Sequence, residues 1–261
     1  MNDGEADELR AACCLVYVRD CTPSTNFSGI GTISSVGFSN KNYAQWPCAN
    51  GNPQPLCSLN NEDFLLTIAR QLGVSKSKTT YKADIFVNGK GVSLKSHRRN
   101  PPAIVNHTAR HGWIMAANNS NGNADMNTLD TIIANYWDLR TKGLIPEDIS
   151  NSSPQSPFAG NKDIVKPFLL YFLSKGSASG LSPYPADYIF DFSDPLNING
   201  WSVFTPDSYV EHYWNRLVFS VRSKKGMPLN YSPSCKSYNL IAPWTRFHQG
   251  DYRGALHVRV K

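Results

Sequence analysis

The chain has 261 residues, of which 41% are hydrophobic, and this length is sufficient for one domain with a substantial buried core. Lys and Arg number 26 against 20 Asp and Glu, a modest formal net charge of +6. No apolar stretch reaches transmembrane length, and residues 1–10 lack the basic and apolar segments of a signal peptide, so we expect a cytoplasmic protein without a membrane segment.

The first part of the chain predicts an arm followed by a helix. Residues 22–59 are rich in Ser, Asn, Gly and Pro and therefore predict a loop-dominated arm. Residues 60–73 contain an Asn suitable for an N-cap, the acids Glu62 and Asp63 in the first turn, apolar residues at helical spacing and a final Gly. We expect this helix to pack under the segment that follows it.

Residues 81–96 carry the most informative pattern, which is that of a short β-hairpin. An apolar run at 83–87 is followed by Asn, Gly, Lys and Gly, residues typical of a tight turn, and the alternation then resumes over 92–96. Because strand side chains alternate between two faces, Ser93 and Lys95 should point the same way, while Val92 and Leu94 face a core. Asp84, at the start of the partner strand, can then lie beside Ser93 and Lys95.

A carboxylate and a lysine on adjacent strands suit phosphodiester hydrolysis. The carboxylate is a ligand for Mg²⁺, and the ammonium can orient an attacking water and offset phosphate charge. Asp84, eight intervening residues and then Ser93-Leu94-Lys95 resembles the PD-(D/E)xK nuclease motif, and in a chain of this size it is most similar to a type II restriction endonuclease.

Two positions depart from that motif. Ala83 replaces the proline, which has little chemical weight, whereas Ser93 replaces the second metal-binding carboxylate, and a hydroxyl is a poorer Mg²⁺ ligand. Some members of the superfamily compensate with an acid from the preceding helix. Glu62 is the expected compensating ligand and Asp63 is its rival on a different face of the helix; alternatively, both acids only favour the helix dipole.

The charge distribution around the hairpin suits a phosphate-bearing partner. Residues 70–99 contain eight basic residues and a single acid, Asp84. Beyond the hairpin, two consecutive prolines at 101–102 predict an extended connection whose polar side chains can contact phosphates or base edges. The candidates for contact with DNA are Arg98, Arg99, Asn106, His107 and Arg110.

The remaining chain predicts helices and strands. Residues 128–142 form an amphipathic pattern for core or dimer packing, residues 163–175 a helix limited by Pro167, and residues 188–192, 201–204, 216–221 and 255–260 strands. The expected fold class is α/β or α+β, with a central mixed β-sheet flanked by helices in a restriction-endonuclease-like core. We expect one nuclease domain over 1–261, with a catalytic core at about 60–115, and 116–261 completing the core and supplying DNA-recognition and dimerisation elements.

The resemblance implies Mg²⁺-dependent hydrolysis of both strands of double-stranded DNA. Asp84, Glu62 and a backbone carbonyl near Leu94 would hold the metal, Lys95 would position the water, and Ser93 would order a ligand water or a phosphate. Because a two-fold symmetric site is cut once on each strand, we expect a homodimer. A cognate DNA methyltransferase is expected as the functional companion.

Other interpretations remain open from the residues alone. His107 and His111 have helical spacing for zinc, but no Glu stands between them as in a His-Glu-x-x-His site. The six cysteines include no Cys-x-x-Cys and are expected to be buried free thiols. The alternative functions are a nucleic-acid-binding protein without catalysis and a secreted, disulfide-bonded binding domain.

Overall fold

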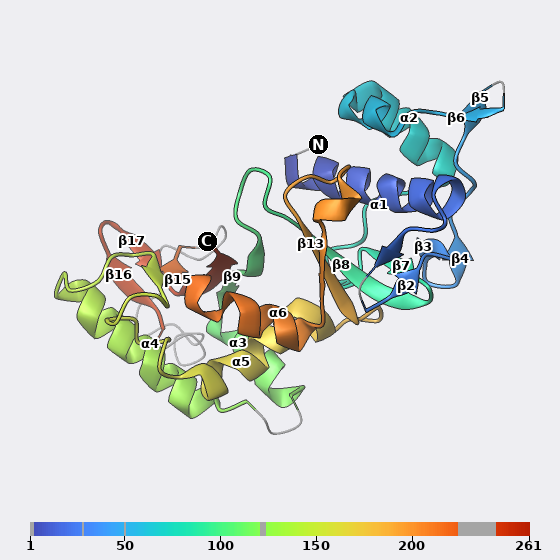
Figure 1. Cartoon of the computed structure of the whole chain (residues 1–261). Coiled ribbons are helices and arrows are strands. Elements are labelled where there is room, and N and C mark those ends of the chain that lie inside the picture. Colours follow the sequence, from blue (N-terminus) through green and yellow to red (C-terminus); the bar gives the residue numbers. More distant parts are fainter. Residues whose placement is uncertain (1–2, 28, 50, 121–123, 224–243) are drawn as a thin grey trace. The chain divides into compact units, whose positions relative to one another are not determined.

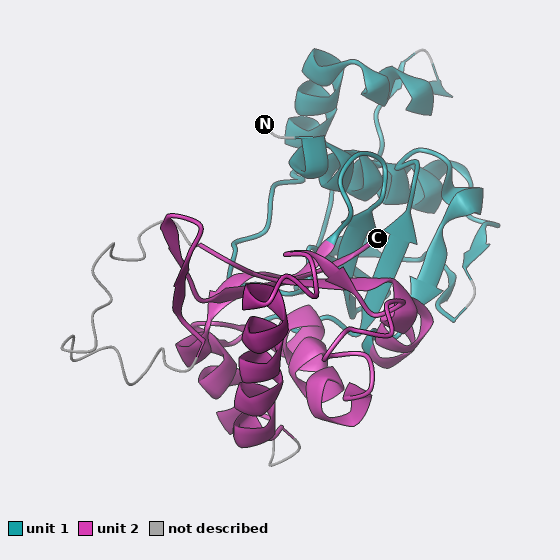
Figure 2. Ribbon diagram, turned by 90° about the vertical axis from the view of Figure 1, so that its left-hand side faces the viewer, with its two compact units in different colours: residues 1–102, 183–206 teal, residues 103–182, 207–261 magenta. Residues whose placement is uncertain are grey.

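The chain divides into two compact units (Figure 2). The computed structural model describes residues 3–27, 29–49, 51–120, 124–223 and 244–261, so Cys235 lies outside the described residues. The first unit comprises residues 1–102 and 183–206, and the second comprises 103–182 and 207–261. This differs from the single domain expected from the sequence. Because the chain leaves the first unit near residue 102 and returns at 183, the hairpin shares its unit with the strand at 188–192.

A six-stranded mixed sheet forms the centre of the first unit, in the order β14-β13-β8-β7-β3-β4 (Figure 1). Strands β8 and β13 pair in parallel, and the other neighbours are antiparallel. The strands are β3 (Val36–Phe38), β4 (Lys41–Asn42), β7 (Ile85–Val87), β8 (Lys90–Ser96), β13 (Tyr188–Phe192) and β14 (Ser202–Phe204). A central mixed sheet flanked by helices is therefore confirmed, and the fold class is α+β.

Two helices bury the apolar side chains of this sheet. Helix α1 (Asp3–Cys21) packs against β8 and β3, and α2 (Glu62–Leu72) packs against α1 (Figure 1). The predicted helix at 60–73 is confirmed, since Asn61 caps α2 by accepting a hydrogen bond from the Phe64 amide and Gly73 ends it at φ 77°. The core beneath the helices includes Val92, Leu94, Ile85, Val87, Phe190 and Phe192.

Residues 22–59 contribute to the core of the first unit rather than forming an arm. Phe27, Ile33 and Trp46 are buried, and β3 pairs directly with β7 of the hairpin. The turn-rich composition belongs to short strand pairs joined by turns. Strands of this length are too short to show an alternating pattern of apolar residues, so the sequence predicted an arm. These pairs are β1 (Asn26–Phe27) with β2 (Gly31–Thr32) and β5 (Cys48–Ala49) with β6 (Asn52–Pro53); a 3₁₀ turn follows at Leu56–Asn60.

The second unit contains a four-stranded antiparallel sheet in the order β10-β15-β18-β9. Its strands are β9 (Ala103–Ala109), β10 (Ile149–Ser150), β15 (Leu217–Arg222) and β18 (Ala255–Val260), with two further pairs, β11 (Gly176–Ser177) with β12 (Gly180–Leu181) and β16 (Arg246–His248) with β17 (Asp251–Arg253). Its helices are α3 (Arg110–Asn118), α4 (Met126–Thr141), α5 (Lys162–Leu170) and α6 (Pro206–Tyr213), and α5 continues into a π-helical turn, Tyr171–Lys175. Helix α4 confirms the amphipathic pattern, because it buries Leu129, Ile132, Ile133, Tyr136 and Trp137.

Two further sequence expectations concern membrane segments and cysteines. Among the described residues, no helix combines the length and apolarity needed to cross a bilayer. The five described cysteines are unpaired; Cys13 and Cys14 are buried, whereas Cys48 and Cys57 are exposed. The expectation of buried free thiols therefore holds for Cys13 and Cys14 and is wrong for the two exposed residues.

Candidate active site

Asp84 lies where the two strands of the hairpin separate. The last antiparallel pair is Ile85 with Val92, and the Asp84 amide donates to the Val92 carbonyl at 2.8 Å. The Asp84 carboxylate then bridges to the partner strand, because its Oδ2 accepts from the Leu94 amide at 2.8 Å and from Ser93 Oγ at 3.3 Å. Ser77 Oγ donates to Oδ1 at 3.0 Å. Three donors therefore fix the orientation of this carboxylate, which retains further lone pairs for a ligand.

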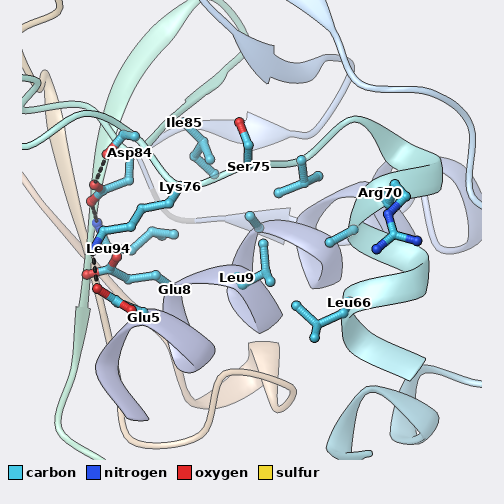
Figure 3. A pocket seen from close by; sticks show the side chains of 14 residues that line it. Glu5, Glu8, Leu9, Leu66, Arg70, Ser75, Lys76, Asp84, Ile85 and Leu94 are labelled. Carbon is cyan, nitrogen blue, oxygen red and sulfur yellow. Dashed lines mark hydrogen bonds and ion pairs between the residues drawn. The ribbon is translucent and has the colours of Figure 1, made fainter. Parts of the chain in front are cut away.

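A cavity of about 410 Å³ opens beside Asp84, between α1, α2 and the hairpin (Figure 3). Figure 3 shows Asp84, Glu8, Glu5 and Lys76 at one end of this cavity and Arg70 at the other. Apolar side chains form most of the wall between the two ends: Leu9, Ala12, Leu66, Ala69, Val74, Ile85 and Leu94. The carboxylates therefore meet at the polar end of an otherwise apolar hollow.

Glu8 supplies the second carboxylate at this end, from the first turns of α1. The pKa of Glu8 is raised to about 7 by burial and by the negative charge of Asp84, while Lys95 and Lys76 act in the opposite direction. A partly buried carboxylate whose ionisation is opposed by a neighbouring carboxylate forms with it a donor set that a divalent cation would stabilise. Mg²⁺ needs only one or two protein carboxylates, so the set is of the right size, although no cluster of three His, Cys, Asp or Glu occurs among the described residues.

Sequence reasoning did not find Glu8 because α1 was not predicted. Four consecutive residues of α1, Cys13 to Val16, are completely buried, so apolar residues surround the helix and the 3.6-residue periodicity is lost. The acids Asp3 and Glu5 in the first turn and Arg19 in the last turn are the signal that could have revealed it.

Glu62, the expected compensating ligand, does not line the cavity beside Asp84. It borders a separate polar hollow of about 230 Å³, shared with Asp3, Asp7, Arg10, Asn60, Arg98 and Arg99. Asp63 is exposed at the start of α2 and does not line the cavity beside Asp84 either. Helix α2, which precedes the hairpin in the chain, lines that cavity with Leu66, Ala69 and Arg70. Its other residues, Glu62 and Asp63 among them, lie on other faces of the helix.

Asp7 holds α1 against the end of β8 and so positions Glu8. This buried carboxylate accepts from Ser96 Oγ at 3.0 Å and pairs with Arg10 at 3.2 Å and Arg98 at 3.1 Å. Arg99 pairs in the same way with Asp3 at 2.5 Å. Arg98 and Arg99, which the sequence nominated for DNA contact, therefore also attach the N-terminal part of α1 to the segment after β8.

Lys76 lines the cavity and forms an ion pair with Glu5. Lys95 follows Ser93 on one face of β8, as the alternation predicted, and it pairs in register with Asp191 of β13. Lys95 does not line the cavity, whereas its neighbour Leu94 does, and the positive charge of Lys95 acts to lower the pKa of Glu8. Lys82, which the sequence interpretation did not select, has its pKa lowered to about 8 by burial and by the charge of Lys95.

The other candidates for DNA contact lie in the second unit. Asn106 is exposed on β9, and the ring of His107, at φ 37°, lies 4.7 Å from the ring of His257. Arg110 forms a two-point pair with Asp130, at 2.9 and 2.5 Å, which holds α3 to α4. His111 begins the first turn of α3, and the zinc interpretation gains no third ligand from the described residues.

Comparison with known proteins adds no name to this site. No protein-family model, no curated protein and no solved structure matches the chain.

Proposed function

We propose that the chain is a Mg²⁺-dependent endonuclease of the PD-(D/E)xK type, most similar to type II restriction endonucleases, which hydrolyses phosphodiester bonds of double-stranded DNA. The observation that carries this proposal is that the Asp84 carboxylate, directly before β7, accepts hydrogen bonds from Ser93 and Leu94 of β8, the strand that also carries Lys95, and lines one cavity with Glu8. The order of a helix, an acid directly before a strand, a tight turn and a strand with the lysine agrees with the order that the motif requires.

The residues divide the work of hydrolysis as follows. Asp84 and Glu8 would hold Mg²⁺, together with a backbone carbonyl near Leu94, and the cation would supply positive charge to the phosphate oxygens. Lys95 would orient the water whose oxygen attacks phosphorus, and it would offset the charge that develops there. Ser93, buried beside Asp84, would order a ligand water or a phosphate oxygen. Glu8 thus takes the part that the sequence interpretation gave to Glu62.

The partners follow from the same proposal. A palindromic recognition site would be cut by a homodimer, one strand for each subunit. An enzyme of this kind requires a companion DNA methyltransferase and a location in the cytoplasm, where it meets incoming DNA.

Cleavage of phage and plasmid DNA tests the proposal. Wild-type protein, Asp84→Asn and Lys95→Ala should be incubated with DNA in Mg²⁺ or in EDTA. Asn is preferred to Ala at position 84 because the carboxylate also accepts three hydrogen bonds, and a side chain of equal size limits structural damage. We expect discrete fragments from wild type in Mg²⁺ alone, and no fragments from either variant.

Two results would contradict the proposal. Equal cutting by the variants would place the active site elsewhere. DNA that is bound but never cut, on varied unmethylated substrates, would leave Asp84 with the structural role of joining β7 to β8 and would favour the binding protein without catalysis.

A further inference from the structure

Four aromatic rings of the first unit pack together beside the loop that leads to Asp84. Phe38 of β3, Phe86 of β7, and Tyr81 and Tyr184 from the adjoining loops are all partly exposed. The ring centroids of Tyr81 and Tyr184 are 4.7 Å apart, and that of Phe38 lies 5.0 Å from Tyr184 and 5.5 Å from Tyr81. Phe86 completes the cluster at 5.7 Å from Phe38 and 6.0 Å from Tyr184. We call these four residues the aromatic platform.

The platform is fixed to the candidate active site by the backbone. The amides of Lys82 and Ala83 both donate to the Tyr184 carbonyl at 3.0 Å, directly before Asp84 in the chain. Two neighbouring residues of one loop, Ser77 and Lys78, also connect Asp84 with the platform. Ser77 donates to the Asp84 carboxylate at 3.0 Å, and the Lys78 ammonium lies 5.9 Å from the centre of the Tyr81 ring. The rings and the carboxylate therefore occupy adjacent parts of one rigid segment.

The surroundings of the platform are basic. Lys41 pairs in register with Phe38, Lys78 lies over Tyr81, and Lys82 separates Tyr81 from Asp84. Asp84 is the only acid in the three sequence segments that carry the rings, residues 36–42, 77–87 and 183–186. Lys41 and Lys78 are both exposed, so their charges can be reached by an anionic ligand.

Partly exposed rings bordered by lysines match the chemistry of unpaired nucleotides. Bases stack on aromatic side chains while lysines follow the phosphates, and both contacts are independent of sequence. A base inside a duplex is already stacked on its neighbours, so only an unpaired base can use such rings. Tyr81 is partly exposed and Lys78 is exposed, so a ligand that stacks on Tyr81 would displace the Lys78 side chain, whose charge could then contact a phosphate.

We propose that the aromatic platform binds unpaired bases of a nucleic acid next to the phosphodiester at Asp84. This inference rests on the proposed nuclease function for the position of the bond, but the binding itself requires no cleavage. On double-stranded DNA, such bases would become available where the two strands separate locally beside the bond that is cut.

Binding in EDTA tests the platform without any contribution from catalysis. Fluorescence anisotropy should compare a labelled blunt duplex with the same duplex carrying a single-stranded tail, for wild type, Tyr81→Leu and Tyr81→Phe. We expect wild type to bind the tailed DNA at least about tenfold more tightly, Tyr81→Phe to keep this preference, and Tyr81→Leu to lose most of it because Leu lacks a flat ring. Phe247→Leu is the matched control, since Phe247 is an exposed aromatic residue of the second unit, and it should leave the preference unchanged.

Wild-type affinity that is equal for the two DNAs would overturn the inference, and so would a Tyr81→Leu variant, folded by circular dichroism, that keeps the full preference. The two proposals can fail separately. A preference for tailed DNA without cleavage in Mg²⁺ would support the platform and remove the nuclease, whereas cleavage of blunt duplex without any preference would do the opposite.

Discussion

The negative charge of Asp84 opposes ionisation of the Glu8 carboxylate, although 75 residues separate the two in the chain and they come from a hairpin and a helix. Burial and the charge of Asp84 together raise the pKa of Glu8 to about 7. Neither effect involves a hydrogen bond between the two groups. A divalent cation bound by both carboxylates would offset the negative charge that opposes ionisation of Glu8.

Replacing Glu8 by Gln should weaken Mg²⁺ binding and cleavage by about 100-fold, because a ligand should matter at least as much as the outer-shell residues whose loss costs about 10- to 100-fold. The fold should survive, since the change removes a partly buried charge. The measurement is the rise in melting temperature on adding Mg²⁺ at pH 8, with cleavage as a second readout.

Glu62→Gln is the control for that experiment. Glu62 borders the other hollow and should leave both the Mg²⁺-induced rise and the cleavage rate at the wild-type level. A larger loss for Glu62→Gln than for Glu8→Gln would restore the ligand that the sequence suggested and would remove Glu8 from the site.

Acid should destabilise the second unit through His257. Burial, followed by the charges of His107, Arg222 and Arg259, lowers the pKa of His257 from 6.5 to about 4. Above pH 6.5 the ring is neutral in both the folded and the unfolded states, and the full stability is present. Between pH 6.5 and 4 only the unfolded state takes up the proton, so up to about 3 kcal/mol of stability is lost. Urea unfolding at pH 7.5, 5.5 and 4.5 should show a smaller loss in His257→Gln; an identical loss would assign the effect to other groups.

Gly91→Ala should destabilise the first unit more than Gly89→Ala. A Cβ at Gly91 would lie 2.2 Å from the Pro185 carbonyl oxygen, so backbone must move, and we expect a cost of about 3 kcal/mol. At Gly89 the added Cβ meets no atom within 4 Å and only the positive φ of 75° opposes it, at about 1 kcal/mol. Urea midpoints compare the two variants, and a Gly91→Ala protein as stable as Gly89→Ala would show that the hairpin does not approach Pro185 so closely.

The cysteines should react with iodoacetamide in two classes. Burial raises the pKa of both Cys13 and Cys14 to about 12, so almost no thiolate forms at pH 8, and the helix also blocks access. Cys48 and Cys57 are exposed and should be labelled in the folded protein. Peptide mass spectrometry before and after urea distinguishes the classes. Labelling of Cys13 in the folded state as fast as Cys57 would contradict the burial of α1.

The sequence was most informative where the structure is locally encoded. The hairpin at Asp84 to Lys95 follows from turn residues and alternation, and α2 follows from its Asn cap, apolar spacing and final Gly. The parts that it missed lack such signals. Helix α1 is apolar on every side around Cys13 and Cys14, and β3 spans only Val36–Phe38 within a segment of turns.

The sequence by itself determined that Asp84 and Lys95 lie on neighbouring strands, since a turn of fixed length leaves little freedom in their register. Only the tertiary structure decided which second acid meets Asp84. Glu62 precedes the hairpin closely and lies on the predicted helix, yet Asp7 binds Arg10, Arg98 and Ser96 and thereby carries Glu8 to the site. A contact between residues this far apart in the chain depends on how α1 packs against β8, and no local pattern of residues encodes that packing.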